Sequence, residues 1–188
     1  MTALLDWRRR VNAIYAAVRD LPPQEGHALW TATRRDLYAT HPESAGPLGP
    51  VAPYDPAWRA VVALSAAAPA RIEVATGTDG VVAFERVGVL HTPWGPLDAW
   101  WLASYGGGLW VPVRDPSTRS YGGGRYLLDT VKGADLGSVG GDLVVDLNFL
   151  YPPSCAYDER WACPLAPPGN VLPVPVDAGE LGDHLEHR

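Results

Sequence analysis

The first forty residues carry the hydrophobic pattern of two amphipathic helices. On one face of the first helix, apolar residues recur at spacings of three and four: Leu4, Trp7, Val11, Ile14 and Val18. Thr2 is a suitable N-cap, and Leu21-Pro22-Pro23 ends this helix. The second helix is predicted from about Gln24 to Ala39, ahead of His41-Pro42. We therefore expect a pair of helices within residues 1–41.

After residue 58 the pattern changes to short runs rich in Val, Ile, Trp and Leu, separated by turn residues. The predicted strands are 58–64, 71–76, 81–91, 97–103, 109–113, 125–131, 142–147 and 171–176. Thr78-Asp79-Gly80 is a good hairpin turn between the second and third of them. Because the spacing is that of an antiparallel meander, the strands would best bury their apolar faces by curling into a small barrel.

We therefore predict an α+β fold, a small antiparallel β-barrel of split-barrel type with an N-terminal helical pair. The 188 residues should form one domain, since most domains hold roughly 100 to 200 residues. Its parts are the helical pair at 1–41, a connector at 42–57, the barrel at 58–180 with a proline-rich loop at 148–170, and a tail at 181–188.

Composition and charge exclude several classes of protein. Hydrophobic residues make up 47% of the chain and charged residues 19%, which is typical of a folded protein and not of a disordered one. The net charge of -6 provides no positive field that would attract nucleic acid. No apolar run reaches the roughly 18 to 20 residues of a membrane span, and Asp6 and Arg8 interrupt the N-terminal pattern, unlike in a signal peptide. We expect a cytoplasmic protein with no nucleic-acid or membrane partner; a homodimer is compatible with these features.

The region from Asp146 to Asn170 differs from ordinary hairpin sequence, because prolines fix much of its backbone and aromatic residues supply large surfaces. Together with Tyr121 to Leu127, Leu172 to Glu180 and the upstream Tyr54 to Arg59, this region resembles the bacterial and archaeal domain-of-unknown-function 1684 family. The resemblance covers nearly the whole chain. It implies the fold boundaries and a signature region but assigns no catalytic role. The signature residues are Asn148, Tyr151, Cys155, Tyr157, Cys163 and Asn170.

The two cysteines, Cys155 and Cys163, lie eight positions apart in this region. A zinc site would need further ligands from elsewhere, because two thiolates are too few and no His lies in the loop. The two cysteines could form a disulfide, but disulfides are disfavoured in the cytoplasm. Cys155 could instead be a nucleophile activated by Arg125, or both thiols could simply pack beneath the loop. We expect both cysteines to be reduced and free of metal.

Arg125 follows the glycine triplet 122–124 at the start of a predicted strand. The exposed amides of such a turn and the guanidinium could hold a carboxylate or a phosphate. Alternatively, Arg125 pairs with Asp115 or Asp146 and only stabilises the barrel. The spacing of a dinucleotide-binding glycine motif is absent.

Asp146 and Asn148 follow an apolar run and are expected on the same face. The carboxylate could act as a base and the amide as an orienting donor in proton transfer. Equally, the two side chains could cap the loop that follows.

These observations predict a site at the mouth of the barrel. Asp146 and Cys155 are its candidate catalytic residues, and Arg125, Tyr126, Asn148 and Tyr151 its candidate substrate-binding residues. We expect a small-molecule binding protein for an anionic metabolite, and an enzyme is conceivable that uses acid–base or thiol chemistry. No cofactor or metal is expected. The alternative is a flavin-dependent redox protein of split-barrel type that binds FMN.

Overall fold

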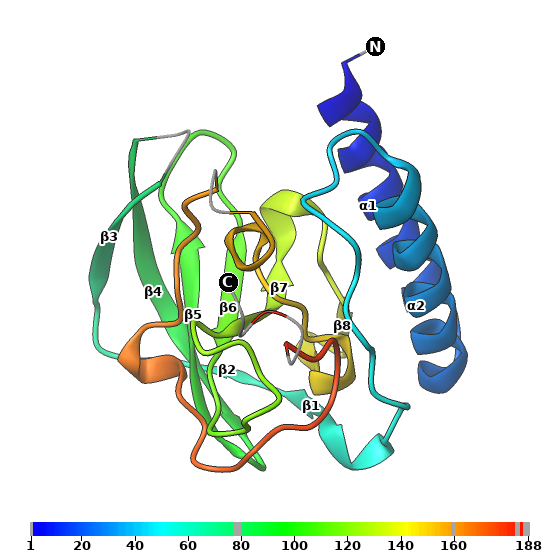
Figure 1. Cartoon of the computed structure of the whole chain (residues 1–188). Coiled ribbons are helices and arrows are strands. Elements are labelled where there is room, and N and C mark those ends of the chain that lie inside the picture. Colours follow the sequence, from blue (N-terminus) through cyan, green and yellow to red (C-terminus); the bar gives the residue numbers. More distant parts are fainter. Residues whose placement is uncertain (1, 77–79, 159–160, 183–184, 186–188) are drawn as a thin grey trace.

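The computed structural model describes residues 2–76, 80–158, 161–182 and 185. Its two long helices are α1 (Ala3–Arg19) and α2 (Pro23–Thr40), which lie side by side along one flank of the molecule (Figure 1). Thr2 caps α1 by accepting a hydrogen bond from the backbone N of Leu5. The predicted helical pair is therefore confirmed. No helix among the described residues is both long and apolar enough to cross a membrane.

The strands form two antiparallel sheets on the other side of the molecule (Figure 1). The larger has the order β2-β4-β5-β6-β7, with β3 also paired to β4; the smaller has the order β1-β9-β8. The bounds are β1 Arg59–Val62, β2 Leu64–Ser65, β3 Arg71–Ala75, β4 Val81–Thr92, β5 Gly95–Leu102, β6 Leu109–Val113, β7 Arg125–Asp129, β8 Ser138–Val139 and β9 Asp142–Asp146.

The α+β class and the antiparallel pairing are as predicted, but the strand pairings of the described residues do not close a barrel. The strand predicted at 171–176 is wrong. This segment makes only an isolated bridge from Val171 to Arg114. Pro173 and Pro175 lack the N–H groups that a ladder needs, which explains why pairing stops there. The predicted turn at Thr78-Asp79-Gly80 lies largely outside the described residues.

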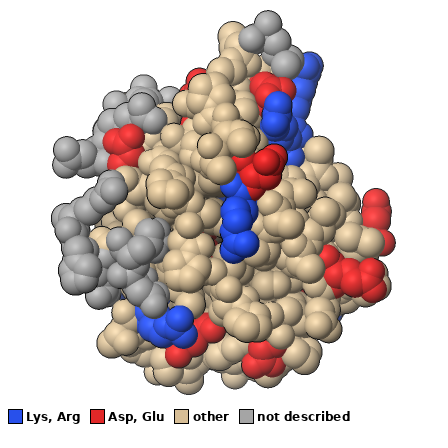
Figure 2. Space-filling model, turned by 45° about the vertical axis from the view of Figure 1, so that its right-hand side comes forward, with Lys and Arg blue, Asp and Glu red and all other residues tan. Residues whose placement is uncertain are grey.

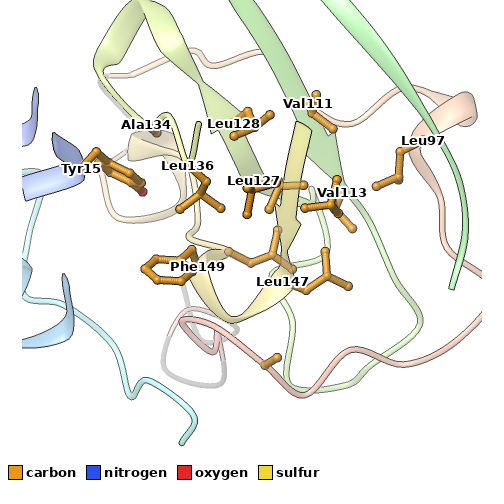
Figure 3. Packing of buried hydrophobic residues seen from close by; sticks show 14 of the residues in the cluster. Tyr15, Leu97, Val111, Val113, Leu127, Leu128, Ala134, Leu136, Leu147 and Phe149 are labelled. Atoms are coloured by element: carbon orange, nitrogen blue, oxygen red, sulfur yellow. The ribbon is translucent and has the colours of Figure 1, made fainter. Parts of the chain in front are cut away.

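The main hydrophobic core fills the space between the two helices, the sheets and the 3-10 helix Leu147–Phe149. Figure 3 shows Leu147 beneath Leu127 of β7 and Phe149 beneath Leu136. All four side chains are buried. The short helix is therefore anchored by its apolar residues, which fixes the polar residues beside them.

The C-terminal segment 176–181 connects distant parts of the chain. Its backbone pairs with the connector through Ala52 N to Gly179 O at 2.9 Å and Leu181 N to Pro50 O at 2.8 Å. Gly179 has a φ of +73°, and a Cβ there would lie 2.5 Å from the carbonyl oxygen of Leu150. Only glycine fits this close approach.

Candidate functional site

Arg125 lies in a buried ion pair at the start of β7. Its Nη2 atom is 3.0 Å from Asp115 Oδ2, and its two Nη atoms also donate to three carbonyl oxygens of the C-terminal segment. The side chain is completely buried. Of the two partners considered from the sequence, Asp115 is correct and Asp146 is wrong. Because these donors are already bound, Arg125 stabilises the C-terminal segment rather than facing a site.

A second buried ion pair joins α2 to the C-terminal segment. Arg34 Nη2 lies 2.9 Å from Glu180 Oε2. The other carboxylate oxygen of Glu180 accepts hydrogen bonds from the backbone N of Gly49, at 3.0 Å, and from the hydroxyl of Tyr157. The guanidinium of Arg34 lies 4.8 Å from each of three aromatic ring centroids, those of Trp30, Tyr38 and Tyr151. Both charges are paired and enclosed, so this network is also structural.

Asp146 ends β9 and caps the short helix that follows. Its Oδ1 atom accepts hydrogen bonds from the backbone N of Asn148 at 3.1 Å and from the side-chain Nδ2 of Asn148 at 2.8 Å. The capping role is therefore confirmed. The two side chains meet because the chain turns into a helix at Leu147, and not through the strand alternation expected from the sequence.

With the described residues, the other carboxylate oxygen of Asp146 makes only long contacts. Oδ2 lies 3.5 Å from the hydroxyl of Tyr54 and 3.7 Å from Arg59 Nε. Asp146 lines a cavity of about 130 Å³ between the end of α1 and the three-stranded sheet, which we call the Asp146 cavity. Arg19, Arg59 and Ser138 supply its other polar side chains. One oxygen of Asp146 is thus anchored, while the other lacks a short partner.

Burial raises the pKa of Asp146 to about 6, although the hydrogen bonds from Asn148 and the positive charge of Arg59 oppose this shift. Burial also raises the pKa of Tyr54 to about 12, and the negative charge of Asp146 adds to the effect. Near neutral pH, Asp146 can therefore gain or lose a proton while Tyr54 keeps its own. A carboxyl group with a raised pKa at a cavity is a common feature of functional sites.

Asn148 positions Asp146 instead of facing a ligand. Its Nδ2 donates to Asp146 and to the backbone oxygen of Asp55 at 2.8 Å, and its Oδ1 accepts from the backbone N of Asp55 at 3.0 Å. Both amide protons and the oxygen are thus bound, and the residue is completely buried. The prediction that Asn148 binds a substrate through its amide is not supported by this geometry.

Tyr126 and Tyr151 form a separate group. Their backbones exchange hydrogen bonds of 2.8 and 3.2 Å, and their ring centroids lie 5.9 Å apart. The hydroxyl of Tyr126 donates to the backbone oxygen of Pro164 at 2.6 Å. Within the described residues, no hydrogen bond joins either tyrosine to Asp146. The single barrel-mouth site predicted from the sequence is therefore split into at least two places.

Cys155 and Cys163 lie together beside this second group. The backbone N of Cys155 donates to Cys163 Sγ at 3.4 Å, and the two thiols are half-buried and not joined by a disulfide. The hydrogen bond to Cys163 and burial raise the pKa of Cys155. Arg125 is bound to Asp115 and to the C-terminal segment, so this geometry does not support an activation of Cys155 by Arg125. In the part of the chain with described coordinates, no group of three or more His, Cys, Asp or Glu side chains is arranged to hold a metal ion.

Sequence reasoning missed Arg59 and Tyr54 as neighbours of Asp146. Arg59 opens β1 and pairs in register with Asp146 on β9, a pairing between strands far apart in the chain. Tyr54 lies in the irregular connector. Both belong to residues 54–59, which combine charged and aromatic residues in a proline-rich stretch. This composition was the sequence signal that could have indicated a part in the site.

On the face drawn in Figure 2, basic and acidic side chains are scattered among uncharged ones. No continuous basic area is visible in the described part of this face. A charged ligand there would therefore interact with single side chains and not with an extended charged surface.

A model of the family described as "Protein of unknown function (DUF1684)" matches residues 49–181. The chain belongs to this family. The residues matched by the DUF1684 model include both Tyr54 to Arg59 and the Asp146 region. The chain is also similar to an uncharacterized protein of Haloarcula marismortui whose structure was solved by solution NMR, with 29% sequence identity and a TM-score of 0.51. The similarity covers 84% of this chain and 94% of the archaeal one. No curated protein matches the chain.

Proposed function

We propose that this DUF1684 protein binds a small organic anion in the Asp146 cavity and that Asp146 exchanges a proton with it. The observation that carries the proposal is the asymmetry of the Asp146 carboxylate. One oxygen is held by two hydrogen bonds from Asn148, and the other has only contacts of 3.5 and 3.7 Å at a cavity. This asymmetry supports the sequence-based hypothesis that Asp146 takes up a proton.

The charge of the cavity favours an anion. Arg59 contacts Asp146 only at 3.7 Å, too long for a strong hydrogen bond, so its guanidinium has donors available for a ligand. Arg19 donates from Nη1 to the backbone oxygen of Asp135 at 2.7 Å and lines the same cavity. Guanidinium groups suit carboxylates and phosphates because they donate two parallel hydrogen bonds. Arg19 is also paired with the carboxylate of Asp135 at 3.9 Å, so Arg59 is the main positive charge for a ligand. The carboxylate that lines the cavity, Asp146, is only partly ionised near its pKa of about 6.

The chemistry that fits is general acid–base catalysis. A carboxyl group is an effective proton carrier when its pKa is near the working pH, and burial has moved Asp146 in that direction. An anion held by Arg59 would present an acidic C–H, O–H or N–H group to Oδ2. The neutral hydroxyl of Tyr54 does not line the cavity, but it lies 3.5 Å from Oδ2 and would help to hold the ionised carboxylate in place.

NMR titration of the uniformly ¹⁵N-labelled protein tests ligand binding without knowledge of the natural ligand. The probes are small carboxylates of increasing size and inorganic phosphate, with neutral amides of similar shape for comparison. We expect anions, and not amides, to shift the backbone signals of Leu136, Ser138 and Val144, which line the cavity. Arg59→Gln should abolish these shifts.

Arg71→Gln is the matched control, because Arg71 is an exposed arginine of β3 that pairs only with surface carboxylates of Glu73 and Glu85. It should leave the anion-dependent shifts unchanged. Equal effects of the two variants, or anion-dependent shifts confined to other regions, would contradict the proposal.

The size of the cavity favours a small ligand over FMN. Sites for drug-sized ligands usually enclose about 300–1,000 Å³, whereas the Asp146 cavity has about 130 Å³. The flavin-dependent split-barrel protein stays a prediction, and visible absorption of the purified protein in the flavin region would support it.

A further inference from the structure

The paired cysteines lie outside the Asp146 site and have no part in the chemistry proposed for it. We propose that Cys155 and Cys163 form a dithiol site that reacts with hydrogen peroxide and converts reversibly to a disulfide, with Cys163 as the attacking residue. This is a redox function on the proline-rich loop and does not depend on the anion-binding function.

The first argument is the contact between the two residues. The backbone N of Cys155 donates to Cys163 Sγ at 3.4 Å, and the two thiols also hydrogen-bond to each other. Disulfide formation requires two sulfur atoms that can approach each other without a large backbone movement. Cys155 lies in the 3-10 helix Ser154–Ala156, and the chain returns at Cys163 to meet it. The loop thus brings together two residues that are eight positions apart.

The second argument is access. Both cysteines are half-buried, whereas an inert structural cysteine is usually fully enclosed. Peroxide is small enough to reach a half-buried thiol. The chain just after Cys163 is also held in place, because the backbone oxygen of Pro164 accepts from Tyr126 and the backbone N of Ala166 donates to Gly123 O at 3.3 Å. The two residues are therefore not sealed from solvent, while Cys163 is kept close to Cys155.

The third argument concerns the charge around each sulfur. Hydrogen bonds from Cys155 lower the pKa of Cys163, and the ammonium group of Lys132 acts in the same direction. Lys132 is the only lysine of the chain, and it lies 3.5 Å from Asp129. Burial and the charge of Asp129 oppose the shift. Among the described residues, Tyr121 and Tyr126 also interact with the pair.

The reaction balances with peroxide as the oxidant. The thiolate of Cys163 attacks one peroxide oxygen, the O–O bond breaks, and the leaving hydroxide takes up a proton to become water. Cys163 is now a sulfenic acid. The sulfur of Cys155 then attacks the sulfur of Cys163, an S–S bond forms, and the hydroxyl group leaves as a second water with the proton of Cys155. Two thiols lose two electrons in total, and one peroxide is reduced to two waters.

Mass spectrometry of the reduced protein after hydrogen peroxide treatment tests the proposal. We expect the chain to lose two hydrogen atoms and to remain a single chain. Arg160 lies between the two cysteines, so trypsin places them on different peptides. The disulfide should therefore appear as two linked peptides that a thiol reductant separates. Unchanged thiols under conditions that oxidise glutathione, or a link between two chains in place of one within the chain, would overturn the proposal.

Variants that each replace one cysteine show which of the two attacks peroxide. In Cys155→Ser, peroxide should produce a sulfenic acid on Cys163 that dimedone traps, because no second thiol is present to remove it. Cys163→Ser should react much more slowly at neutral pH. Fast peroxide reaction in Cys163→Ser together with none in Cys155→Ser would overturn the assignment of Cys163 as the attacking residue.

The wild-type chain gives a readout that does not depend on the folding of either variant. Iodoacetamide should label Cys163 on the order of tenfold or more faster than Cys155 at neutral pH, because the thiolate is the reactive form. A serine at position 155 can still donate a hydrogen bond to Cys163, whereas alanine cannot. The midpoint of the pH dependence of Cys163 labelling should therefore be higher in Cys155→Ala than in Cys155→Ser. Equal labelling rates in the wild type, or equal midpoints in the two variants, would contradict the roles proposed for these residues.

Discussion

Two buried acidic side chains of this protein, those of Asp115 and Asp146, have very different sets of partners. Asp115 faces the guanidinium of Arg125 at 3.0 Å, and its other oxygen accepts a hydrogen bond of 2.9 Å from the backbone N of Val176. Asp146 has one anchored oxygen and one with only long contacts, beside a cavity. A buried charge with all its partners in place stabilises structure, while a buried charge with a partner missing is available for chemistry. Asp115 thus has a structural role and Asp146 a candidate chemical role, a difference that the sequence alone does not show.

The largest effect is expected from Arg125→Ala. The substitution leaves Asp115 charged and buried and deprives three carbonyl oxygens of their donor. Breaking a buried ion pair from one side typically costs about 3–5 kcal/mol, so the melting temperature should fall sharply in thermal unfolding. Arg71→Ala, at an exposed ion pair, serves as the control and should change little. A small effect of Arg125→Ala would remove the distinction between the two acidic groups.

A smaller loss of stability is expected from Glu180→Gln. The amide removes the negative charge opposite Arg34 but keeps nearly the same shape. Hydrogen bonds to charged groups contribute about 1.5–3 kcal/mol, and we expect a loss of about 2 kcal/mol in denaturant unfolding. Stability equal to that of the wild type would show that the Arg34 network contributes less than its burial suggests.

Asp146→Asn should instead stabilise the protein, in a pH-dependent way. The pKa of Asp146 is raised to about 6 in the folded chain and is about 3.9 in an unfolded one. Folding therefore binds a proton between these values, and the contribution of Asp146 to stability is lost as the pH rises through about 6. The variant should gain about 2–3 kcal/mol relative to the wild type between pH 4 and 7. Denaturant unfolding across this range measures the difference, and a constant difference would contradict the shifted pKa.

The smallest change in stability is expected from Arg59→Gln. Arg59 is partly exposed and contacts Asp146 only at 3.7 Å, so the free energy of unfolding should change by less than about 1 kcal/mol. Its effect should appear in anion binding instead. A large loss of stability without a change in anion binding would place Arg59 with the structural ion pairs.

The sequence predicted the helices well because their signals are local. Apolar spacing, the Thr2 cap and the proline stops all lie within or next to the elements that they define. Strand alternation is equally local: the neighbouring residues Trp100 and Trp101 of β5 are 3% and 44% exposed. The failed strand at 171–176 had the composition of a strand, but its prolines cannot take part in a ladder. Barrel closure depends on pairing between distant strands, which a local pattern does not encode.

The site was predicted only in its acidic part. Asp146 and Asn148 are two positions apart, so their association followed from the sequence. Arg59 reaches Asp146 through the pairing of β1 with β9, which joins the start of the sheet region to its end. The assignment of Arg125 to a ligand failed because its true partners are mostly backbone carbonyls, and no residue type in the sequence marks these.

The C-terminal segment 176–181 is synthesised later than the two arginines that it pairs with. Chains are made from the N-terminus, so Arg34 and Arg125 emerge long before the carbonyls and the carboxylate of this segment. Until residue 181 has been synthesised, both guanidinium groups are without these partners and cannot be buried at low cost. Burial of both guanidinium groups therefore depends on residues 176–181. A chain cut short before residue 176 would keep the residues of the helices and sheets but would lack these partners, and it should be less stable than the full chain.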